Sequence, residues 1–124
     1  MEPKNFQEIF GIVEDHLPNK WEKFALYIAF VGNMSSHKFF VDSGKGYISC
    51  FDLGYEKATL REIFMSIEDI LIEEREKLPK KKRWSVFTLL VDSNGEFEAN
   101  YSYDDISDTF TEYQRNWEKK LINK

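Results

Sequence analysis

The sequence has few cysteines, prolines and glycines, the residues that cross-link a chain or interrupt its helices and strands. Its 124 residues include one cysteine, three prolines and six glycines. The lone Cys50 cannot form an intramolecular disulfide, which favours a reducing cytoplasm. We find no signal-peptide pattern and no apolar run of roughly eighteen residues, so we expect neither secretion nor a membrane span. The hydrophobic fraction of 42% and the chain length predict one folded domain over residues 1–124.

Signatures of catalysis and of metal or nucleotide binding are also missing. The only histidines are His16 and His37, and the chain has no Gly-x-Ser-x-Gly, Walker, His-Glu-x-x-His or Cys-x-x-Cys pattern. The stretch from Asp92 to Gly95 is faintly similar to a calcium loop, but its glycine stands fourth rather than sixth. We therefore expect no enzyme, no catalytic residue, no metal and no cofactor. The net charge of −5 also argues against nucleic-acid binding.

Hydrophobic periodicity is present and predicts the elements. A helical stripe with Asn5 as N-cap and Glu8 three residues later is followed by "WEKFALYIAFVG", which alternates as a strand does. One face of that strand holds Phe24, Leu26, Ile28 and Phe30, and the other holds Ala25, Tyr27 and Ala29. Because Tyr27 lies on the second face, we expect that face to be partly exposed and aromatic. Two further strands, "HKFFVD" and "GYISCFDL", complete an antiparallel meander.

The second half of the chain repeats the pattern of helix and hairpin. Thr59 and Glu62 suggest a capping box at the start of a long helix, whose Met65 and Ile72 lie opposite its apolar stripe and could meet either a loop or a partner. After a basic loop, "WSVFTLLVDSNGEFEANYSY" predicts a hairpin around Asn94-Gly95. A last amphipathic helix contains Ile106, Phe110, Tyr113, Trp117 and Leu121. The order α-β-β-β-α-β-β-α predicts an α+β fold with a five-stranded antiparallel sheet and three helices.

Negative charge is concentrated in one window of the chain. From Trp84 through Gln114 there is no lysine or arginine. The same window holds seven acidic residues: Asp92, Glu96, Glu98, Asp104, Asp105, Asp108 and Glu112. With these seven removed from the net charge of −5, the remainder carries +2. An ordinary solvated surface would mix charges of both signs.

The predicted elements give this window a geometry. On the second strand of the hairpin, Phe97, Ala99, Tyr101 and Tyr103 share one face, which leaves Glu96 and Glu98 on the other. On the last helix, Asp105, Asp108 and Glu112 would form one stripe. The arrangement suggests an acidic docking surface for a basic partner, although helix capping by Asp104 or Asp105 and a merely solvated acidic face remain alternatives.

The order of these landmarks resembles the YezG-like immunity proteins, bacterial antitoxins that neutralise nuclease toxins. The resemblance spans about residues 17–121, and its most specific parts are Trp21-Glu22-Lys23 and Asn94-Gly95-x-Phe97 leading into Tyr101-x-Tyr103-Asp104-Asp105. It implies a cytoplasmic inhibitor that pairs with a cognate toxin domain, with no direct binding of nucleic acid or membrane. The acidic window would then occupy the toxin's cationic groove. Two competing interpretations remain: a small-ligand or enzymatic α+β domain with a pocket lined by Tyr27, Tyr101 and Tyr103, and a self-assembling structural protein.

Overall fold

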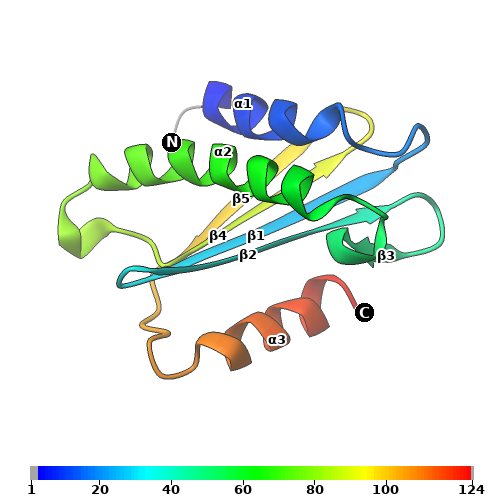
Figure 1. Ribbon diagram of the computed structural model, residues 1–124. Coiled ribbons are helices and arrows are strands. Elements are labelled where there is room, and N and C mark those ends of the chain that lie inside the picture. The colour runs from blue at the N-terminus through cyan, green and yellow to red at the C-terminus, as the bar shows by residue number, and fades with distance from the viewer. Residues whose placement is uncertain (1–2, 124) are drawn as a thin grey trace.

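The computed structural model describes residues 3–123, and its elements follow the predicted order. They are α1 (Pro3–Glu14), β1 (Lys23–Val31), β2 (Met34–Asp42), β3 (Tyr47–Ser49), the 3-10 turn η1 (Cys50–Asp52), α2 (Lys57–Glu76), the 3-10 turn η2 (Lys80–Lys82), β4 (Val86–Asp92), β5 (Phe97–Ser102) and α3 (Phe110–Leu121). The strands form one antiparallel sheet in the order β3-β2-β1-β4-β5. Helices α1 and α2 cover one face and α3 covers the other (Figure 1). The predicted α+β fold is confirmed.

The central strand β1 is buried on both of its faces. Phe24, Leu26 and Ile28 pack into the cluster beneath α1 and α2, as the alternation predicts. Tyr27 belongs to the cluster beneath α3 and is 0% exposed, so the expectation of a partly exposed face is wrong. The physical reason is the ring of Trp117, whose centroid lies 5.0 Å from that of Tyr27. A helix that the sequence could not place on a face therefore covers this side of the sheet.

The two predicted capping boxes are absent. Asn5 lies inside α1, is only 7% exposed, and its side chain hydrogen-bonds to Glu74 of α2 instead of capping the helix. In α2 the N–H of Leu60 donates to the carbonyl of Glu56 over 3.1 Å, so helical bonding begins three residues before Thr59. Both helices start upstream of the residues that the capping signal selects.

The last helix starts later than its apolar pattern predicts. α3 begins at Phe110 with Thr109 as a cap that makes no side-chain hydrogen bond. Ile106 lies in the preceding loop, where it is 2% exposed and packs with Tyr27 and Trp117. An apolar contact from a loop thus mimics the periodicity of a helix. Within residues 3–123, no helix is long and apolar enough to cross a bilayer.

Candidate partner-binding surface

The turn between β4 and β5 is built around the carboxylate of Asp92. Its Oδ1 accepts the N–H of Asn94 over 2.9 Å and the N–H of Glu96 over 3.1 Å. The backbones of Asp92 and Glu96 are also paired, and Gly95 has a φ of 88° that only glycine adopts without strain. The predicted hairpin is confirmed, and of Asn94 and Gly95 only the glycine has a positive φ. Asp92 therefore serves the turn itself.

Glu96 and Glu98 extend from this turn into solvent. β5 alternates as predicted: Phe97 and Ala99 pack against the core beneath α1 and α2, and Glu98 is exposed on the opposite face. A shallow hollow of 460 Å³ lies beside these carboxylates. It is lined by Lys23, Tyr47, Leu90, Val91, Asp92, Glu96, Phe97 and Glu98. We call Asp92, Glu96 and Glu98 the hairpin group.

The other four acidic residues surround the start of α3, and we call Asp104, Asp105, Asp108 and Glu112 the loop group. Asp105 accepts the N–H of Ser107 over 3.0 Å and its hydroxyl over 2.7 Å. These two bonds hold the pKa of the Asp105 carboxyl below its usual value. Glu112 lies in the first turn of α3, where negative charge complements the helix dipole. Asp105 thus caps a turn and not the helix, which is a correction to the predicted capping role.

The helical stripe predicted for Asp105, Asp108 and Glu112 is wrong, because only Glu112 lies within α3. The two acidic groups are also far apart. β5 has six residues, which at roughly 3.3 Å each put about 20 Å between the β4–β5 turn and the start of the loop. Figure 1 places that turn and the loop before α3 at opposite ends of the sheet. The predicted surface is therefore two acidic groups joined by an exposed edge strand.

None of the ion pairs between described residues involves either acidic group. The pairs within residues 3–123 join His37 to Glu68, Lys38 to Glu118 and Lys77 to Glu74. Lys23 lies opposite Asp92 on β1 and lines the same hollow, but the three carboxylates of the hairpin group outnumber it and leave a net negative charge there. The acidic residues of the window are thus divided between the two ends of β5.

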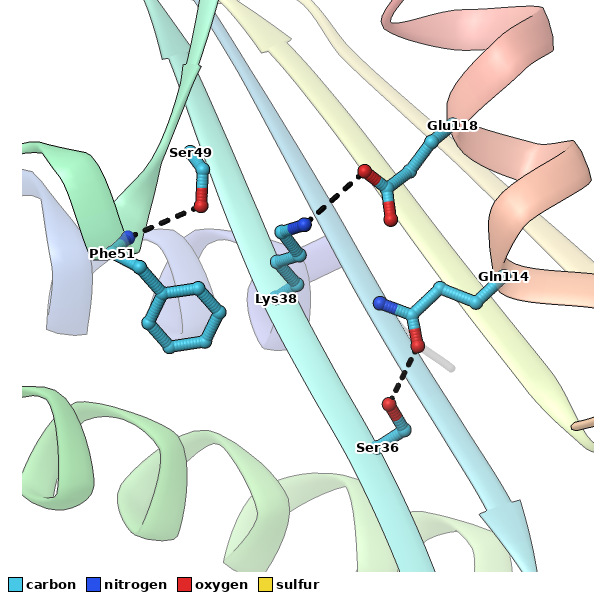
Figure 2. A network of polar contacts seen from close by, with 6 residues as sticks. All are labelled: Ser36, Lys38, Ser49, Phe51, Gln114 and Glu118. Carbon is cyan, nitrogen blue, oxygen red and sulfur yellow. Dashed lines mark hydrogen bonds and ion pairs between the residues drawn. The ribbon is translucent and has the colours of Figure 1, made fainter. Parts of the chain in front are cut away.

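Helix α3 is attached to the sheet by polar contacts that the sequence did not predict (Figure 2). The hydroxyl of Ser36 donates to Gln114 Oε1 over 2.7 Å, and Lys38 Nζ lies 3.2 Å from Glu118 Oε1. Further along, the buried Trp117 Nε1 donates to Thr88 Oγ1 over 2.9 Å. These contacts fix α3 and, through it, the position of the loop group.

The predicted tyrosine pocket does not form, since Tyr27 and Tyr101 lie on opposite faces of the sheet. Tyr101 and Tyr103 instead border a hollow of 530 Å³ with Leu78, Lys81, Lys82 and Trp84. The lysine run next to Trp84 is the sequence signal for this basic and aromatic hollow. The interpretation as a small-ligand or enzymatic domain therefore loses the three-tyrosine pocket on which it was based.

A family model for YezG-like immunity proteins ("Immunity protein YezG-like") matches residues 3–123. The chain therefore belongs to the YezG-like immunity protein family. No protein in the curated collection matches the chain. Membership in this family implies an immunity protein with a toxin as binding partner.

Proposed function

We propose that the chain is a cytoplasmic antitoxin that binds a cognate nuclease toxin and blocks its cationic groove with the two acidic groups. Family membership supports the immunity role. The observation that carries the rest is the set of seven acidic residues, none of which takes part in an ion pair between described residues. A nuclease needs a positive groove to hold phosphates, and carboxylates compete for the same groove.

We propose two different roles for these seven acidic residues. Asp92 and Asp105 use carboxylate oxygens to shape turns, so they contribute charge and rigidity. Glu96, Glu98, Asp108 and Glu112 are exposed, and we propose that they contact the toxin directly together with Asp104. A toxin that meets both groups must present basic residues about 20 Å apart along its groove. Turns that are already formed reduce the entropy cost of binding.

The test is the affinity for a cognate nuclease toxin domain, measured by calorimetry across a salt series. The variant Glu98→Lys/Asp108→Lys reverses one charge in each group. We expect it to bind at least about tenfold more weakly, because close interfacial charge pairs couple by about 1.5–7 kcal/mol in barnase–barstar. We also expect a flatter dependence on salt. The matched control Glu8→Lys/Glu73→Lys makes the same net change at exposed positions on α1 and α2.

Three different results would contradict three different parts of the proposal. Equal weakening in both double variants would mean that net charge matters and the acidic groups do not. Unchanged binding by Glu98→Lys/Asp108→Lys would remove the acidic groups from the interface. Failure of the wild-type chain to bind the toxin or to rescue cells that express it would remove the immunity role itself.

A further inference from the structure

The sheet edge at β2 is only partly covered. β3 pairs with β2 at three positions, all at the end of β2, and no described strand pairs with the outer edge along Met34–Lys38. The carbonyl of Asp42 accepts the N–H of Glu22 over 2.7 Å on the β1 side. Since backbone groups alternate between the two sides of an antiparallel strand, Ser35 and His37 direct their N–H and C=O groups outward. An additional strand could pair with these groups.

A hollow of 460 Å³ lies between this edge and α2. It is lined by His37, Phe51, Lys57, Leu60, Arg61, Phe64, Met65 and Glu68, of which the six from α2 form one helical stripe. Phe51 and Met65 are exposed by 61% and 57%. Figure 2 shows the Phe51 ring next to β2, and its centroid is 6.0 Å from Lys38 Nζ. Of the two roles that the sequence allowed for Met65, covering by a loop does not occur among the described residues.

The acidic group of this hollow has a partner within the chain, whereas its basic groups form no ion pair with a described residue. The His37 ring stacks on Phe64 with centroids 4.1 Å apart, and its Nδ1 is 3.6 Å from the Glu68 carboxylate. The cations Lys57 and Arg61 are exposed, and neither forms an ion pair with a described residue. The negative charge of the hollow thus already faces a histidine, while the positive charge at its rim is available to an outside carboxylate.

We propose that the outer edge of β2 and this hollow bind an extended segment of a partner protein, with acidic and apolar side chains, as a sixth strand. Strand addition beside a helix obtains affinity from main-chain hydrogen bonds and specificity from side-chain pockets. The main-chain hydrogen bonds form with Ser35 and His37. The apolar side chains of the segment contact Phe51 and Met65, and its carboxylates pair with Lys57 and Arg61. The site lies at the sheet edge opposite β5, so it does not depend on the proposed toxin surface.

The probe is a phage-displayed library of random twelve-residue peptides, selected on the full chain. We expect enriched peptides with apolar side chains at alternate positions and acidic residues between them. A synthetic copy should shift or protect the amide signals of Ser35 and His37 in NMR spectra. N-methylation of the peptide amides that face β2 should weaken binding by about tenfold, since it removes main-chain hydrogen bonds and leaves the protein unaltered.

A charge variant and its control complete the test. Arg61→Glu, at an exposed position, should weaken binding of the enriched peptide by about tenfold. Lys120→Glu makes the same charge change at an exposed position on α3, on the other face of the sheet, and should bind the peptide as the wild type does. Three results would overturn the proposal: no enrichment above background, enriched peptides that perturb other amides, or affinity indifferent to N-methylation. A concentration-dependent dimer whose interface covers Ser35 and His37 would assign the edge to a second copy instead. Because the toxin-affinity assay is separate, failure here leaves the proposed function standing.

Discussion

Asp92 and Asp105 illustrate why the role of a single carboxylate cannot be read from its charge. Both are acidic residues in the same window, and each has an oxygen that accepts two hydrogen bonds within its own turn. Glu98, by contrast, is exposed on an edge strand. The charge pattern of the sequence does not distinguish these three residues, because hydrogen bonds within a turn depend on backbone angles that charge does not encode.

The buried hydroxyl of Tyr27 gives a prediction for the free energy of unfolding. Among the described residues this hydroxyl has no hydrogen-bond partner, although the side chain is 0% exposed. Replacing Tyr27 by phenylalanine removes the cost of burying the group and keeps the ring beside Trp117. We expect Tyr27→Phe to be neutral or to raise the free energy of unfolding by up to about 1 kcal/mol in urea titrations. A loss of more than that would reveal a bond that the hydroxyl makes.

The same residue gives a pH dependence with a defined sign. Burial, with smaller contributions from Tyr113 and Glu118, raises the pKa of Tyr27 above its ordinary value. The unfolded chain therefore loses this proton at lower pH than the folded chain does, so the contribution of Tyr27 to stability is present below about pH 10 and declines above it. From about pH 9 to about pH 11, the urea midpoint should fall more steeply for the wild type than for Tyr27→Phe. Parallel curves would contradict this assignment.

At the scale of elements, the sequence predicted the bodies of helices and strands well and their ends poorly. The apolar stripes of α1 and α2 and the alternation of β1 are all present, because burial of one face controls them. The caps at Asn5 and Thr59 are not, since a side chain within reach of another helix or a turn that starts earlier can replace the capping bond. The start of α3 was also misplaced, because Ile106 packs into the apolar cluster from the preceding loop and not from the helix.

The attachment of α3 can be tested by removing one contact at a time. Trp117 joins apolar packing on Tyr27 and Phe40 to a hydrogen bond with Thr88. We expect Trp117→Ala to lower the free energy of unfolding by about 3–5 kcal/mol. Gln114→Ala, which removes one half-buried hydrogen bond on the same helix, should cost less than about 1.5 kcal/mol. Similar losses for both would mean that polar contacts and not the indole hold α3.

At the scale of the whole molecule, the element order and sheet type followed from the sequence, but the shape of the acidic surface did not. The window is continuous in sequence, yet β5 carries the chain about 20 Å between its two groups. Placing the loop group required the true start of α3 and the face that α3 covers, both of which depend on tertiary packing. The location of the hollow beside α2 depended on the shortness of β3 in the same way.

We also propose that residues 1–124 unfold as one unit, because both apolar clusters share the central strand β1. Circular dichroism at 222 nm and tryptophan fluorescence should then give the same urea midpoint, in roughly the two-state manner of small domains. Trp84 and Trp117 report on opposite faces of the sheet. Two separate transitions would show that α3 detaches before the rest.

Amide hydrogen exchange of the chain, with and without its toxin domain, shows whether the two acidic groups bind the toxin. We expect slower exchange in residues 92–98 and 104–112 on binding, with the edge along Met34–Lys38 unchanged. Protection confined to other segments, with both acidic groups exchanging as fast as in the free protein, would contradict it.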